Sequence, residues 1–136
     1  MTPRHALIFV AFLDSTLALG HSYWWRPRGF SMEPAIRDGD RILIAPVEPD
    51  RLRVGDVVKY RVGDELRMHR LVKTHSYAGD RLFVLRGDRG TSEDTVPAGA
   101  VIGRALAVER NGHVRRLDSA TDRWRIRLRG WLGWNP

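Results

Sequence analysis

The stretch "RPRGFSMEPAIRDGDRILIAP" (26–46) leads from a serine-bearing turn into a run of strand-forming residues. Ser31 lies between Gly29, which permits backbone angles that other residues avoid, and Pro34, which has no N–H to give to a strand ladder. Such a turn can present a hydroxyl and its own backbone N–H outward. Taken alone, a serine in a turn of this kind is typical of structure, so its chemistry depends on what the rest of the chain supplies.

Downstream of this turn, short apolar runs alternate with turn residues. The Gly63-Asp64 pair predicts one hairpin, and Asn111-Gly112 predicts another with the strongest short signal in the chain. We expect strands at 41–45, 55–61, 66–73, 81–86, 100–110 and 113–117. The sequence therefore predicts a mainly β domain built from hairpins, with a short helix at one or both ends.

Composition bounds the protein class. A chain of 136 residues that is 43% hydrophobic and 29% charged is typical of one globular domain. The absence of cysteine excludes disulfides and thiolate zinc sites. The net charge is +7, and 21 of the 23 basic residues are arginine. Residues 103–136 hold eight arginines against three acidic residues, which suits an anionic surface of lipid or nucleic acid.

The two ends of the chain leave alternatives open. "ALIFVAFLDSTLALG" (6–20) fits a helix packed on the body with Asp14-Ser15-Thr16 in water, a membrane anchor, or a removed signal peptide. "RWRIRLRGWLGW" (123–134) fits a membrane-surface segment or an element packed on the domain. We expect three parts: an apolar helix or membrane-proximal segment at 1–22, a β domain at 23–117 and a basic tail at 118–136.

A hydroxyl becomes a useful nucleophile only when a base takes its proton. Among the five histidines, His69 alone lies inside a predicted strand, and imidazole is the natural base near neutral pH. Asp88 and Asp94 bracket the loop after the next strand, where one of them can orient the imidazole. Alternation over this strand gives two faces, one with Arg67, His69, Leu71 and Lys73 and the other with Met68, Arg70 and Val72.

The motifs in this order resemble the signal peptidase I-like serine peptidases, which share a fold with LexA-type repressors. "GFSMEPAIRDGDRILI" resembles the nucleophile box of that family, and "GDVVKYR" resembles the next box. "MHRLV" resembles the box with the general base, and "LRGDRGTSED" resembles the last box. The resemblance runs from about residue 23 to 108. It implies a LexA/signal peptidase-like fold of short coiled sheets.

The resemblance also implies a subtype, because histidine stands where bacterial housekeeping enzymes carry lysine. As in the endoplasmic-reticulum and archaeal enzymes, Ser31 is then the nucleophile and His69 the base. Asp94 matches the orienting carboxylate, and Asp88 matches the turn aspartate that supports it. Lys59, on the neighbouring strand, stays open as another base.

Substrate binding is expected beside the nucleophile, at Gly29, Met32 and Ile36. The implied activity is cleavage of an extended peptide or preprotein after small residues, with no cofactor or metal. Contact with a membrane surface is expected, although a soluble cytoplasmic protein is an alternative. Two other functions stay open: a non-catalytic peptide-binding relative, and a LexA-like autoproteolytic switch. Only 30 residues precede Ser31, which disfavours a DNA-binding domain and makes nucleic acid an unexpected partner.

Overall fold

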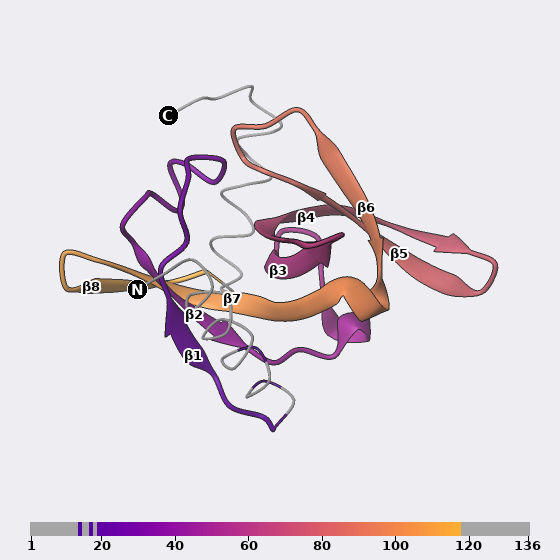
Figure 1. The fold of residues 1–136 in the computed structure, drawn as a ribbon, viewed down its shortest axis with the longest axis horizontal. Helices are drawn as coiled ribbons and strands as arrows, with labels where there is room; N and C mark the ends of the chain where they lie inside the picture. The colour runs from indigo at the N-terminus through magenta and orange to yellow at the C-terminus, as the bar shows by residue number, and fades with distance from the viewer. Residues whose placement is uncertain (1–13, 15–16, 18, 118–136) are drawn as a thin grey trace.

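Eight strands form one antiparallel sheet in the computed structural model of the protein, which describes residues 14, 17 and 19–117 (Figure 1). The strands are β1 (Tyr23–Trp25), β2 (Arg41–Ala45), β3 (Val57–Val62), β4 (Glu65–Tyr77), β5 (Asp80–Arg86), β6 (Glu93–Pro97), β7 (Val101–Arg110) and β8 (His113–Arg116). Two short 3-10 helices, η1 (Pro49–Arg51) and η2 (Ala98–Ala100), lie between strands. The predicted mainly β fold is confirmed.

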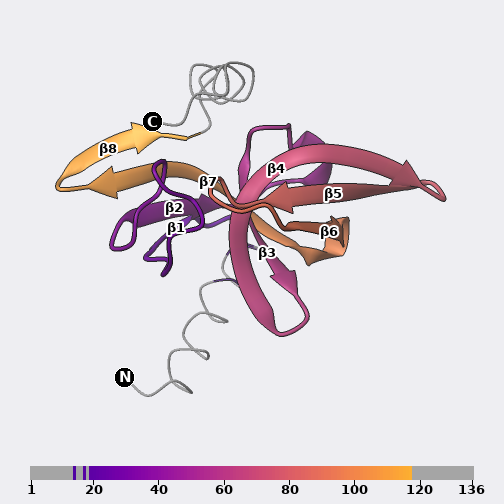
Figure 2. The ribbon, with the colours of Figure 1, turned by 90° about the horizontal axis from the view of Figure 1, so that it is seen from above.

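The strand order is β1-β2-β7-β3-β4-β5-β6, and β8 adds to β7. Strand β7 joins the two halves of the sheet, because it pairs with β2 along one side and with β3 and β8 along the other. Figure 2 shows the β4–β5 hairpin and the β7–β8 hairpin reaching out at opposite ends of the molecule. The centre of the sheet is therefore built from β7, β3 and β4.

Both predicted hairpins are present. Strands β3 and β4 pair from Val62↔Glu65 to Val57↔Arg70 around Gly63-Asp64. The β7–β8 turn has positive φ at both Asn111 (53°) and Gly112 (79°), which is the requirement of a type I′ turn. The register of the first hairpin matters for the site, because it places Val58 opposite His69.

Strand β4 is longer and less regular than the sequence indicates. It continues to Tyr77, beyond the predicted end at residue 73, so His75 also lies in the strand. A β-bulge after Leu71 shifts the register, since Leu71 pairs with Leu85 and Lys73 with its neighbour Val84. Lys73 therefore lies on the face opposite to Leu71, and its expected place on the face of His69 is wrong.

The sheet buries apolar side chains on both faces. Val57 and Val58 are both fully buried although neighbours in a strand point to opposite faces. One cluster contains Leu17, Tyr23, Met32, Ile36, Ile42, Ile44, Val57, Met68, Ala105, Val108 and Leu117. The other contains Leu52, Val58, Tyr60, Leu71, Phe83, Leu85 and Val96. Residues of β3 and β4 belong to both clusters, so apolar packing on the two faces of the sheet fixes the position of these strands.

Two Gly-Asp pairs make the same turn before a core strand. The Asp40 carboxylate accepts the backbone N–H of Arg37 (2.8 Å), and the Asp56 carboxylate accepts that of Arg53 (2.9 Å). Each aspartate also donates its own N–H to the carbonyl three residues earlier, at 3.0 Å. Asp40 is further held by Arg110 through two hydrogen bonds. These turns fix where β2 and β3 begin.

At the N-terminal side, Asp14 and Leu17 are helical and pack on the sheet. Asp14 bonds to Lys59 and Tyr23 with its side chain only 13% exposed, so its expected place in water is wrong. Among the residues that the structure describes, no helix has the length and apolar character needed to cross a membrane. Leu19 and Gly20 form a turn, while residues 1–13, 15, 16 and 18 of the predicted N-terminal segment and the basic tail from residue 118 lie outside the described residues.

Candidate active site

Ser31 is exposed to solvent and is the first residue of a turn that runs to Ile36. Two backbone hydrogen bonds close this turn, from Glu33 N–H to the Phe30 carbonyl (3.2 Å) and from Ile36 N–H to the Met32 carbonyl (2.9 Å). Gly29 precedes it with a φ of +108°, a conformation that glycine adopts without strain. Ser31 therefore lies in a turn outside the strands, between β1 and β2, as the sequence predicted.

Gly87, at the end of β5, brings Ser31 and His69 into one place. A Cβ atom at Gly87 would lie 2.9 Å from the Ser31 carbonyl oxygen, 3.0 Å from Ser31 Cβ and 3.3 Å from His69 Cδ2. His69 Cδ2 is bonded to Nε2, so this edge of the imidazole faces the serine turn. The turn after β5 is also fastened to the serine, because Arg89 N–H donates to the Ser31 carbonyl at 2.9 Å.

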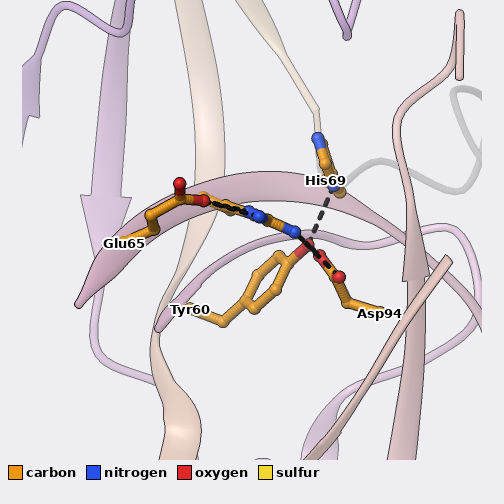
Figure 3. A network of polar contacts seen from close by, with 5 residues as sticks. Tyr60, Glu65, His69 and Asp94 are labelled. Atoms are coloured by element: carbon orange, nitrogen blue, oxygen red, sulfur yellow. Dashed lines mark hydrogen bonds and ion pairs between the residues drawn. The ribbon is translucent and has the colours of Figure 1, made fainter. Parts of the chain in front are cut away.

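The other edge of the imidazole contacts a tyrosine. His69 Nδ1 lies 2.8 Å from the Tyr60 hydroxyl, and that hydroxyl donates a 2.5 Å hydrogen bond to Asp94 (Figure 3). Tyr60 is fully buried and its ring is tilted against the imidazole, with the centroids 5.9 Å apart. The contacts of Asp94 with other described side chains are to Tyr60 and Arg67, so Asp94 reaches His69 through the phenol.

Asp94 lies on β6, although the sequence predicts a loop at these residues. Strand β6 pairs with β5 from Leu82↔Pro97 to Arg86↔Glu93, and this pairing sets Asp94 opposite Leu85. Arg67 Nη1 donates to both oxygens of Asp94, at 2.8 and 2.9 Å. Arg67 also binds Glu65, so the network crosses from the tip of β4 to β6.

The electrostatics leave His69 neutral and Asp94 ionised near pH 7. Burial lowers the pKa of His69, an effect that the charge of Asp94 partly opposes. Burial alone raises the pKa of Asp94, but the hydrogen bonds from Tyr60 and Arg67 outweigh it and hold that pKa below its usual value. Burial and the hydrogen bond to Asp94 raise the pKa of Tyr60, so the phenol keeps its proton.

Asp88 is bound by a buried arginine. Arg70 Nε and Nη2 donate to the two oxygens of Asp88, both at 2.9 Å, and Nη1 donates to the Gly55 carbonyl at 2.8 Å. Arg70 is 3% exposed. This forked pair connects the turn after β5 to β4 one residue beyond His69. Asp88 thus supports the position of the turn that carries Gly87.

A cavity of about 160 Å³ opens beside Ser31 and His69. Its lining includes all three residues predicted to bind substrate, which are Gly29, Met32 and Ile36. Met32 and Ile36 also belong to the buried core, at 4% and 3% exposure. The structure therefore gathers Ser31, His69 and these three residues at one cavity, while Asp88 and Asp94 lie outside its lining.

Lys59 makes its contacts elsewhere. Its Nζ lies 2.9 Å from Asp14 Oδ1, 2.7 Å from the Tyr23 hydroxyl and 4.2 Å from the centre of the Trp25 ring. Lys59 pairs with Met68, whereas His69 pairs with Val58. Burial lowers the pKa of Lys59. The lysine is absent from the described lining of the cavity.

The contacts of Tyr60 and Arg70 were not predicted from the sequence, and Arg67 was predicted only to share a strand face with His69. A usable signal existed for Tyr60. The turn at Gly63-Asp64 pairs Val58 with His69 and Tyr60 with Arg67, so counting from the turn puts Tyr60 on the face of His69. The same count from a turn does not place Asp94, because its strand, β6, pairs with β5 and lies two strands away from β4.

The sequence of the chain is similar to those of known proteins. The chain is 34% identical over 67 residues to the protein named signal peptidase complex catalytic subunit SEC11C from Homo sapiens, and equally to those of Mus musculus and Canis lupus familiaris. The match covers 47% of this chain and 35% of each relative, so the chain matches about a third of their length. The sequence profile of the family described as Peptidase S24-like matches residues 8–106. This match covers well over half of the chain, so the chain belongs to the Peptidase S24-like family.

Proposed function

We propose that this protein is a serine endopeptidase of the signal peptidase type, with Ser31 as nucleophile and His69 as general base. The observation that carries the proposal is the packing around Gly87, against which Ser31 and the Nε2 edge of His69 both lie. Family membership supports a peptidase, and the relatives named as signal peptidase subunits support the processing of preproteins.

The state of His69 suits a base. Its Nδ1 is engaged by Tyr60, which leaves the lone pair of Nε2 for a proton from Ser31. Burial lowers the pKa of His69, so the imidazole is in its neutral, proton-accepting form at pH 7. Asp94 supplies the negative charge that stabilises the imidazolium once it forms.

The proposed reaction is acyl transfer. Ser31 Oγ attacks the peptide carbonyl carbon while its proton passes to His69 Nε2, and the backbone N–H of Ser31 donates to the developing oxyanion. The C–N bond then breaks as Nε2 returns the proton to the leaving amine. A water molecule then attacks the ester carbonyl carbon while one of its protons passes to His69 Nε2. The bond between that carbon and Ser31 Oγ breaks as Nε2 gives the proton to Oγ, which releases the acid and restores the enzyme.

Substrate binding follows from the cavity and the sheet edge. A cavity of about 160 Å³ next to the nucleophile suits a small apolar side chain such as alanine. Strand β4 pairs with β3 over Glu65–Arg70 but with β5 only over Arg70–Tyr77. Within the described sheet, the second edge of 65–69 is therefore unpaired, and an extended peptide can add there as a strand.

The test is cleavage of a synthetic preprotein with an Ala-x-Ala site by the full chain, with and without detergent. Ser31→Ala and His69→Ala are each expected to lower kcat/KM by at least about 1,000-fold. Matched controls are Ser76→Ala and His75→Ala, both exposed on the distal part of β4, which should cleave at the rate of the parent.

Three outcomes decide against the proposal or part of it. Full activity in Ser31→Ala contradicts the nucleophile, and full activity in His69→Ala contradicts the base and points to Lys59. If the parent binds the peptide but leaves it intact in every condition, the protein is a peptide-binding relative and not a protease.

A further inference from the structure

The Tyr60 hydroxyl lies between the imidazole of His69 and the carboxylate of Asp94. In a direct triad these two groups would share a hydrogen bond. The hydroxyl lies 2.8 Å from His69 Nδ1 and 2.5 Å from Asp94 Oδ2 (Figure 3). The contact is enclosed, since Tyr60 is fully buried and the side chain of Asp94 is 18% exposed. The three groups come from β3, β4 and β6, so the sheet sets their spacing.

The protons of this chain of contacts have one consistent arrangement. A phenol has a single proton, and the ionised Asp94 accepts it because a carboxylate is an acceptor only. The phenol oxygen must then accept from His69, which requires a proton on Nδ1. If Tyr60 donated its proton to His69 Nδ1 instead, the phenol oxygen and the Asp94 carboxylate would face each other as two acceptors with no proton between them. Tyr60 therefore selects the imidazole tautomer whose Nε2 is free.

Arg67 makes this arrangement stable. It donates to both oxygens of Asp94 and pairs with Tyr60 across the β3–β4 hairpin. The guanidinium keeps Asp94 ionised, and the ionised carboxylate keeps the O–H bond of Tyr60 directed away from His69. The Tyr60 proton therefore points to Asp94, because the Arg67 guanidinium keeps an acceptor oxygen of Asp94 next to it.

We propose that Tyr60 is a positioning residue that holds His69 in the Nδ1–H tautomer and transmits the charge of Asp94 to it through a phenol. The catalytic consequence rests on the proposed function, whereas the tautomer does not. This protein then differs from a direct Ser-His-Asp triad, because the acid and the base are joined by a third side chain.

The tautomer is measured by the side-chain 15N chemical shifts of His69 in the full chain at a pH where His69 is neutral. In the parent, Nδ1 is expected to be protonated and Nε2 unprotonated. In Tyr60→Phe, which keeps the ring and removes the hydroxyl, the Nε2–H form should become populated and kcat/KM should fall at least about tenfold. The control is Tyr77→Phe, whose side chain is 73% exposed, and neither quantity should change there.

Asp94→Asn gives a second reading if Tyr60→Phe folds poorly. The amide oxygen still accepts the phenol proton, so the Nδ1–H tautomer should persist. The charge that raises the pKa of His69 is lost, so that pKa should fall. An Nε2–H tautomer in the parent, or unchanged tautomer and kcat/KM in Tyr60→Phe, would overturn the inference. A parent that shows the Nδ1–H tautomer but never cleaves peptide contradicts the proposed function alone.

Discussion

Gly87 lies so close to Ser31 that a single added carbon would sit 2.9 Å from the Ser31 carbonyl oxygen and 3.0 Å from its Cβ. The contact is with backbone and Cβ, which cannot swing aside as the end of a long side chain can. The end of β5 and the serine turn are therefore in direct contact, with no room for a side chain between them.

Gly87→Ala is accordingly expected to displace Ser31 from His69 while the sheet stays folded. A shift on the order of 1 Å at the reacting atoms costs about 100-fold in rate, so kcat/KM should fall by about that factor. Overpacking should lower the free energy of unfolding by about 1–3 kcal/mol. The measurements are peptide cleavage and denaturant unfolding.

The matched control is Gly90→Ala, in the same turn. A Cβ at Gly90 would meet its nearest neighbour, the Gly87 carbonyl oxygen, at 3.6 Å, which is an ordinary contact. Equal losses in the two variants would show that the turn tolerates no side chain anywhere and that closeness to Ser31 is not the cause.

The Arg70–Asp88 pair predicts a stability effect. Arg70→Met keeps the apolar volume but removes the donors to Asp88 and to the Gly55 carbonyl. Breaking a buried pair leaves its partner uncompensated, so the free energy of unfolding should fall by about 3 kcal/mol. Urea unfolding of the full chain measures this loss.

Arg86→Met is the control, because Arg86 stands opposite Arg70 in the β4–β5 ladder. Its ion pair with Glu93 is 3.7 Å long and about half exposed on both sides, so the change should be within about 0.5 kcal/mol. An equal loss of unfolding free energy in Arg70→Met and Arg86→Met would show that burial of the Arg70–Asp88 pair does not matter.

The contact of Lys59 with Asp14 predicts non-additive behaviour. Lys59→Met leaves Asp14 buried without its cation and should lower the free energy of unfolding by about 3–5 kcal/mol. Adding Asp14→Leu to Lys59→Met should recover most of the loss, because an apolar pair needs no compensation. A double-mutant cycle by denaturant unfolding measures the coupling, and additive losses would mean that the two residues do not act as a pair.

The pH dependence of cleavage follows from the pKa of His69. Burial lowers this pKa from its ordinary value of 6.5, and only the neutral imidazole accepts a proton from Ser31. Activity should be complete above pH 6.5 and decline as pH falls through the lowered pKa. The acid limb of log kcat/KM against pH should therefore lie below 6.5, with a slope of about one. A limb above that value would mean that a different group, or a His69 stabilised in its charged form, controls the rate.

Much of the sheet could be predicted because local chemistry decides it. The turn residues at Gly63-Asp64 and Asn111-Gly112 require hairpins, and "RILIA" forms β2 at the predicted bounds Arg41–Ala45. The course of the chain at Ser31 was also predictable, since glycine and proline act on their own backbone. His69 was predicted as the base because it was the histidine that lay in the interior of a predicted strand. The catalytic roles of Ser31, His69, Asp88 and Asp94 stay predictions.

Other features were decided only by tertiary structure. Strand β6 has few strand-forming residues and exists because β5 offers it an edge. Asp14 is buried because Lys59, 45 residues away, gives it a cation. The position of Tyr60 between His69 and Asp94 was decided by the tertiary arrangement of β3, β4 and β6. The phenol on β3 reaches Asp94 on β6 although β4 and β5 lie between these two strands in the strand order. Local sequence thus determined the turns and the candidate nucleophile and base. Only the tertiary structure decided how Asp94 reaches His69 through Tyr60, because hydrogen bonds depend on distance in space and not on distance along the chain.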